Sequence, residues 1–168
     1  MRVFTRPATP DDAEAMCGVI NPIIAEGSTT AHRNSFDASR MLRHYIASDR
    51  LISCTVAQAG NQILGFQVLE LCDPDWDEPH PLPADWAVIA SFVLPEAQGK
   101  GAGRALFAAT LSAARAATVP VIDATIRADN VPGLAYYTAM GFEDYGMLRD
   151  VPLSDGQIVD RIRKRYNL

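Results

Sequence analysis

The sequence has few cysteines, and none of them is spaced for metal binding or redox chemistry. The three cysteines are scattered over 168 residues, at Cys17, Cys54 and Cys72. They form no C-x-x-C pair, which is the usual spacing in zinc sites and dithiol motifs. The three histidines are also far apart, at His32, His44 and His80. We therefore expect no metal site, and three buried thiols suited to a reducing cytoplasm.

An excess of positive charge and a long hydrophobic run are also lacking. The formal net charge is −5 and the pI about 5.1, which disfavours binding to a nucleic-acid backbone. No apolar run reaches the roughly 20 residues of a membrane span, and no signal-peptide pattern is seen. We expect neither nucleic acid nor membrane as a partner. The basic residues that do cluster, at 161–165, alternate with apolar ones and predict a solvated strand face.

The length and composition are typical of one globular domain over residues 1–168, with 48% hydrophobic and 21% charged residues. Apolar runs and turn residues predict strands at 3–6, 51–57, 63–71, 86–94, 119–126, 142–148 and 159–165. Helices are predicted from Thr9 to about Ala25, from Asp37, and at 102–117 and 131–140. The order β-α-α-β-β-β-α-β-α-β-β predicts an α/β fold with a mixed sheet.

A glycine-rich loop lies between the strand predicted at 86–94 and the helix that follows it. The loop consists of Gln98, Gly99, Lys100, Gly101, Ala102, Gly103 and Arg104. Glycines allow a bulky anion to approach the backbone, and the start of a helix presents unpaired N–H groups. The two cations add positive charge beside the helix dipole. The loop is therefore predicted to bind a diphosphate.

The amino-acid sequence of this loop resembles a motif of a known family. Gln98-x-x-Gly101-x-Gly103, preceded by Val93-Leu94-Pro95-Glu96, resembles the pyrophosphate loop of the GNAT superfamily of acetyl-CoA-dependent N-acetyltransferases. Asn130, Tyr137 and Gly141-Phe142 resemble a second element of that superfamily. The resemblance implies a GNAT-like fold, acetyl-CoA as co-substrate and no metal. It implies transfer of the acetyl group to an amine by direct attack, through a tetrahedral intermediate.

The resemblance also implies roles for individual residues. In this superfamily the strand before the pyrophosphate loop, called the cradle strand and predicted here at 86–94, parts from its neighbour. The backbone of Ser91, Phe92 and Val93 is therefore expected to hold the pantetheine arm. The N–H of Val93 would face the thioester oxygen. Tyr137 would be the general acid for the leaving thiolate, whereas we expect Tyr136 to pack in the core. Asn130 is expected to contact the cofactor arm, to cap a helix, or both.

The general base is less clear from the sequence. Some relatives carry a glutamate on the cradle strand, but here positions 87–90 read Ala-Val-Ile-Ala. The candidate substitutes are Glu26, Glu70 and the acids of residues 73–78. A chain of water molecules is an alternative to all of them.

The acceptor is expected to be a small primary amine. Residues 21–33 resemble the phosphinothricin and amino-acid acetyltransferase branch, which implies that Arg33 pairs with a carboxylate and Glu26 with an ammonium group. The acidic 73–78 segment would instead suit a polyamine or an aminoglycoside. It lies in a Pro- and Asp-rich loop, 72–84, which is a candidate lid.

Several alternatives stay open at this point. The acceptor could be a protein N-terminus or lysine, or the chain could be a non-catalytic acyl-CoA-binding sensor. A dinucleotide site using Asp123 is disfavoured because the loop lacks the third glycine of that motif. We also expect a homodimer, because strand edges tend to be covered.

Overall fold

A mixed sheet of seven strands, in the order β1-β2-β3-β4-β5-β7-β6, runs through the computed structural model, which describes residues 1–76 and 80–168. The strands are β1 (Phe4–Pro7), β2 (Leu51–Ala59), β3 (Gln62–Leu71), β4 (Ala87–Val93), β5 (Val121–Arg127), β6 (Glu143–Pro152) and β7 (Ile158–Asn167). β4 and β5 are parallel, and the other neighbours are antiparallel. The predicted strands are confirmed.

The helices are α1 (Ala13–Glu26), α2 (Ala38–Met41), α3 (Ala102–Ala116) and α4 (Val131–Ala139). Short helical turns lie at η1 (Pro10–Asp12), η2 (Leu42–Ile46) and η3 (Pro95–Ala97). Thr9 is the N-cap of η1, Asp37 is the N-cap of α2, and Gly27 ends α1 in the left-handed conformation. The predicted order of helices and strands is confirmed.

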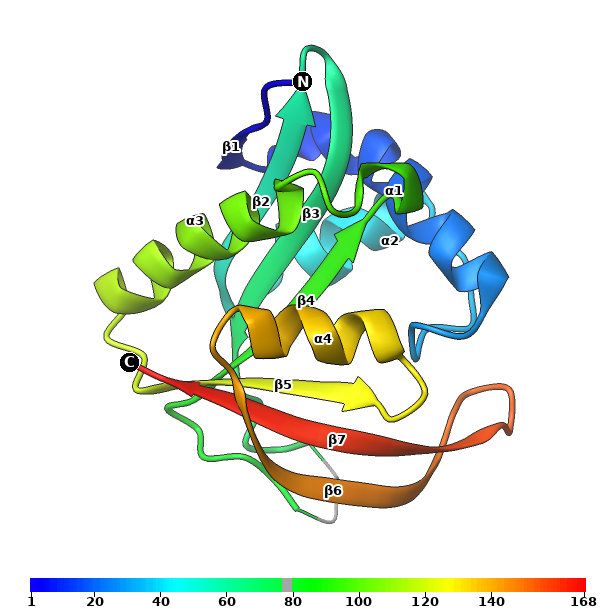
Figure 1. Cartoon of the computed structure of the whole chain (residues 1–168), viewed down its shortest axis with the longest axis vertical. Helices are drawn as coiled ribbons and strands as arrows, with labels where there is room; N and C mark the ends of the chain where they lie inside the picture. The colour runs from blue at the N-terminus through cyan, green and yellow to red at the C-terminus, as the bar shows by residue number, and fades with distance from the viewer. Residues whose placement is uncertain (77–79) are drawn as a thin grey trace.

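The helices cover both faces of the sheet. α3 and α4 lie on one face, and α1 and α2 lie on the other (Figure 1). The core on the α1 side includes Met16, Ile20, Phe66 and Phe92. The core on the α3 side includes Phe107 and other buried side chains of α4, β4 and β5. Alternate residues of β3 and β4 therefore face different cores.

The sheet opens between β4 and β5. β4 pairs with β3 along its full length, from Ala87 to Val93. With β5 it pairs only at Ala87 and Val88, after which the two strands diverge. Figure 1 shows β4 rising away from β5, with α4 drawn across the gap between their ribbons. The parting expected of the cradle strand is confirmed, and it leaves one edge of β4 without a neighbouring strand.

The basic segment 161–165 is not a solvated face, so that prediction was wrong. β7 lies between β5 and β6, and only 7% of Arg163 and 6% of Lys164 is exposed. Lys164 pairs with Asp144 and donates to Thr138 Oγ1. Arg163 donates to the carbonyl of His80 at 2.8 Å. These two side chains point to opposite faces of β7, where they meet Thr138 of α4 and the His80 carbonyl, and alternation alone does not predict such cover.

The three cysteines are buried free thiols, as predicted. A helix able to span a bilayer is absent from the described part of the chain.

Candidate active site

The glycine loop is built as an exposed turn that leads into α3. Gly99 and Gly101 have φ values of 73° and 91°, which L side chains rarely adopt, and Gly101 is the N-cap of the helix. No atom lies within 4 Å of a Cβ placed on either glycine, so the space above them is open. Lys100 and Arg104 are exposed beside them. The loop has the shape, the donors and the charge that a diphosphate group requires.

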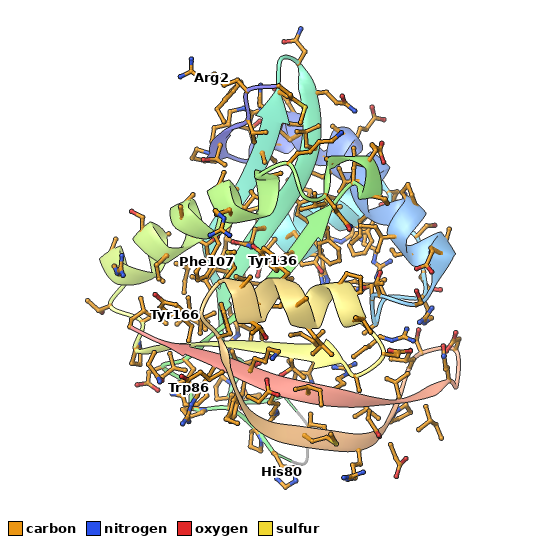
Figure 2. All side chains as sticks on the ribbon, viewed as in Figure 1. Arg2, His80, Trp86, Phe107, Tyr136 and Tyr166 are labelled. Atoms are coloured by element: carbon orange, nitrogen blue, oxygen red, sulfur yellow. The ribbon has the colours of Figure 1, made fainter. Side chains whose placement is uncertain are left out.

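Gly103 is needed for a different reason. A Cβ at this position would lie 2.7 Å from Cε2 of Tyr136, closer than real Cβ contacts. The Tyr136 hydroxyl donates to the carbonyl of Gly103 at 2.7 Å. Figure 2 shows Tyr136 in the space between α3 and α4. The glycine therefore allows α4 to pack directly against the start of α3.

The open edge of β4 presents backbone groups to this region. The Leu94 N–H donates to the Leu64 carbonyl of β3 at 2.8 Å. Peptide groups in an antiparallel strand alternate between its two sides. The backbone N–H and C=O of Ser91 and Val93 therefore face the open edge, while those of Phe92 face β3. The Val93 carbonyl accepts from the Gln98 side chain at 3.4 Å.

Tyr137 lies beside the same edge. It is 6% exposed, and its hydroxyl lies 2.8 Å from the Ser91 hydroxyl. Burial raises the pKa of Tyr137 well above its ordinary value, despite the Ser91 contact that lowers it. The phenol is thus protonated at neutral pH and is able to donate. Tyr136 packs against the α3-side core as expected, and its hydroxyl also bonds to Gln67 and Gly103.

Asn130 uses its side chain within the protein. Its Oδ1 accepts from the Gly133 N–H at 2.9 Å, which confirms the predicted helix cap. Its Nδ2 donates to the Thr29 carbonyl at 2.9 Å and so holds the loop after α1. Contact with the cofactor arm stays a prediction.

A cavity of about 880 Å³ lies on the other side of the parting. Its walls come from β3, the stretch 88–90 of β4, β5, β7, η2 and the loop around residue 32. Trp76, Pro81 and Leu82 of the 72–84 loop line it as well. Asp77 and Glu78, two of the candidate acids, lie outside the described residues.

The two glutamates proposed as bases differ in their surroundings. Glu70 is half-buried in the cavity wall and accepts from the Ser48 hydroxyl at 3.0 Å. Burial raises the pKa of Glu70, which brings it closer to neutral pH. Glu26 is exposed at the end of α1, and hydrogen bonds from Ser28 lower its pKa. Glu26 does not line the cavity, and both features favour Glu70.

Arg33 is not placed as expected for a carboxylate ligand. It donates to the carbonyls of Gly27 and Thr30, at 2.8 and 3.3 Å, and does not line the cavity. Arg127 donates to the same two carbonyls, both at 3.0 Å. The two guanidinium groups fix the loop after α1. The charged residues that do line the cavity include Arg50, paired with Asp73 at 3.1 Å.

Two histidines of the cavity wall were missed by the sequence reasoning. The rings of His32 and His44 lie 5.5 Å apart, and the His32 Nε2 is 2.7 Å from the Tyr45 hydroxyl. Burial lowers the pKa of His32 to about 4 and also lowers that of His44. Both rings are therefore neutral at pH 7. Within residues 1–76 and 80–168, no group of three or more potential metal ligands forms.

Asp123, the residue of the dinucleotide alternative, lies buried in β5. It accepts hydrogen bonds from Thr125 and Tyr145 and lines the cavity. It does not lie at the glycine loop.

Comparisons with known proteins agree with this geometry. The sequence model of the acetyltransferase (GNAT) family matches residues 23–142. Among curated proteins no sequence matches significantly. A putative acetyltransferase of Salmonella typhimurium, yncA, solved with its cofactor acetyl-CoA, has a TM-score of 0.81 at 20% identity, covering 99% of this chain and 94% of that one.

Two further solved structures are similar over nearly the whole chain. A phosphinothricin acetyltransferase of Sinorhizobium meliloti in complex with acetyl-CoA has a TM-score of 0.81 at 18% identity, covering 100% of this chain and 89% of that one. A ribosomal-protein-alanine N-acetyltransferase of Brucella melitensis has a TM-score of 0.82 at 23% identity, covering 98% and 99%.

The family match spans well over half of the chain and contains both the parted edge of β4 and the glycine loop, so the protein belongs to the GNAT family of acetyltransferases, with acetyl-CoA as its co-substrate.

Proposed function

We propose that the protein transfers the acetyl group of acetyl-CoA to the primary amine of a small molecule held in the cavity. The observation that carries this proposal is the position of Glu70. It is a half-buried carboxylate in the wall of a cavity that also contacts β4 at residues 88–90, where the open edge begins. An amine in the cavity is thereby placed between a base and the open edge.

The co-substrate would bind along the other side of that edge. The diphosphate lies on the backbone N–H groups of residues 99–104, beside Lys100 and Arg104. The pantetheine arm pairs with the outward-facing backbone of Ser91 and Val93. The thioester then lies near Val93 and the hydroxyl of Tyr137.

The reaction needs two protons removed from the ammonium nitrogen and one supplied to sulfur. Glu70 pairs with Val88 in the sheet, five residues from Val93, and takes the first proton through a chain of water molecules. The free amine then attacks the thioester carbon, forming the C–N bond. The Val93 N–H stabilises the oxyanion of the tetrahedral intermediate. As the C–S bond breaks, its electron pair goes to sulfur and the Tyr137 hydroxyl donates its proton there; the remaining extra proton on the attacking nitrogen leaves and restores the phenol.

The walls of the cavity suit a small amine with an apolar part. The neutral rings of His32 and His44 do not repel a cation, and Val68, Ile89 and Leu82 provide apolar surface. Glu70 supplies negative charge, whereas Asp73 is paired with Arg50. Trp76, Pro81 and Leu82 line one side, which favours a small molecule over a polypeptide.

The experiment is release of thiol from acetyl-CoA with a panel of amines. The panel contains amino acids, methionine sulfone and sulfoximine, polyamines, aminoglycosides and short peptides. The proposal expects one of the small-molecule classes to respond, and the acetylated amine to be found by mass spectrometry. A response to peptides alone would replace the small-molecule acceptor by a protein one. No response, with acetyl-CoA still binding, would indicate a sensor.

A further inference from the structure

A connected set of buried polar groups joins α3 to Tyr137, and the reaction as described leaves it without a role. Its centre is Gln67 of β3, which is 0% exposed, as is Thr110 of α3. The Thr110 hydroxyl donates to Gln67 Oε1 at 2.6 Å. Gln67 Nε2 donates to the Ser91 hydroxyl at 2.7 Å and to the Tyr136 hydroxyl at 3.0 Å. A glutamine in a core is costly unless its amide is fully bonded, and here it is.

The direction of each hydrogen bond follows from one group that can only accept. The Gly103 carbonyl takes the single proton of the Tyr136 hydroxyl. The Tyr136 oxygen must therefore accept from Gln67, so the Gln67 amide nitrogen, and not its oxygen, faces Tyr136. The same orientation turns the second N–H of Gln67 to Ser91 and its oxygen to Thr110.

The orientation then extends to Tyr137. One lone pair of the Ser91 oxygen is occupied by Gln67, and its own proton points away from that bond. The Tyr137 oxygen lies 2.8 Å away. We assign Ser91 as the donor of this contact, which leaves the proton of Tyr137 to point outside the network. The open edge of β4 lies there.

We propose that Gln67, held by Thr110, is a positioning residue that sets the proton of Tyr137 toward the leaving sulfur. The inference rests on the proposed role of Tyr137 as the acid. Gln67 touches neither the co-substrate nor the amine, and it acts through Ser91. Since Gly103 and Thr110 both belong to α3, the helix that follows the diphosphate loop also orients the acid.

The test uses Gln67→Met, which keeps the length of the side chain and removes its hydrogen bonds, and the pair Thr110→Val and Thr110→Ser. Gln67→Met and Thr110→Val are expected to lower kcat about tenfold with the KM for acetyl-CoA unchanged. Thr110→Ser keeps the hydroxyl and is expected to restore most of the turnover lost in Thr110→Val. Melting temperatures identify variants that fold poorly. If Gln67→Met does not fold, the two threonine variants carry the test.

The deciding measurement is the same substitution in a Tyr137→Phe background. If Gln67 acts through the Tyr137 proton, Gln67→Met or Thr110→Val causes no further loss of kcat there. An equal loss in both backgrounds overturns the positioning role and leaves the acid role intact. Full activity of Tyr137→Phe alone would instead remove the acid from the proposed function, so the two failures are distinguishable.

Discussion

At the scale of single residues, burial sets the protonation of two groups near the open edge of β4. It raises the pKa of Tyr137, which keeps the phenol protonated as a donor. It raises the pKa of Glu70 as well, which makes that carboxylate a stronger base than an exposed one. A site with one acid and one base of this kind matches what acetyl transfer to an amine requires.

Removal of the phenol hydroxyl tests the acid. Tyr137→Phe is expected to lower kcat by about 10² or more, because a positioned proton donor contributes on that order. Binding of acetyl-CoA should change little, since the hydroxyl acts on the leaving sulfur. Steady-state kinetics with the responding amine, together with calorimetric binding of acetyl-CoA, measure the two effects. Wild-type kcat in this variant would exclude Tyr137 from the reaction.

The pH dependence of the rate tests the base. Glu70 must be deprotonated to act, so kcat/KM should fall as the pH drops through its pKa, which lies above the ordinary 4.5. Glu70→Gln should abolish that acidic limb and lower the rate on the plateau. Glu26→Gln is the matched control, since Glu26 is exposed and outside the cavity wall, and it should keep the limb. An unchanged profile in Glu70→Gln would mean that another group or a water chain removes the proton.

At the scale of secondary-structure elements, the contact of α3 with α4 depends on Gly103. Gly103→Ala would bring a Cβ to 2.7 Å from the Tyr136 ring, and Tyr136 is held by two hydrogen bonds. We expect a loss of about 1–3 kcal/mol in the free energy of unfolding, as for overpacked cores. Gly18→Ala in α1 meets no atom within 4 Å and should gain about 0.5–1 kcal/mol.

Urea unfolding of the two alanine variants measures this difference. Equal gains at both positions would show that α4 moves away from α3 without cost. In that case the close contact would have no part in holding Tyr137.

The start of α1 has a stability that depends on pH. Asp12 accepts from the Thr9 N–H and pairs with Arg6 at 2.8 Å, which holds the pKa of Asp12 at about 2. A lowered pKa contributes stability that is present above the unfolded value of 3.8 and is lost as the pH falls through about 2. Arg6 is partly exposed, so solvent screens the pair.

Asp12→Asn is therefore expected to cost about 1 kcal/mol at pH 7 and much less near pH 2. Denaturant unfolding of both proteins at the two pH values measures the difference. If the loss of unfolding free energy in Asp12→Asn does not change with pH, the loss comes from altered hydrogen-bond geometry and not from the missing charge.

At the scale of the whole molecule, local sequence predicted the fold and the co-substrate side of the site. The glycine spacing at 99–103 and the positions of Asn130 and Tyr137 are local patterns, and the order of elements follows from periodicity. The buried contacts were not predictable in this way. Gln67 and Thr110 are 43 residues apart, and His32 and His44 meet only once the loop after α1 packs on η2.

The error at 161–165 has the same origin. Alternation predicts which residues share a face of a strand, but not whether another element covers that face. Only the tertiary structure brings α4 to Lys164 on one face of β7 and the His80 carbonyl to Arg163 on the other.

The central claim is that acetyl-CoA lies along the open edge of β4 and on the loop that follows it. Amide-resolved hydrogen exchange with and without acetyl-CoA tests this most directly. In the free protein, the Val93 amide should exchange faster than that of Phe92, because only the latter faces β3. With acetyl-CoA bound, protection should rise at Val93 and at 99–104 and stay unchanged in the β6–β7 hairpin. Unchanged exchange at 93 and 99–104 under saturating acetyl-CoA would contradict the account.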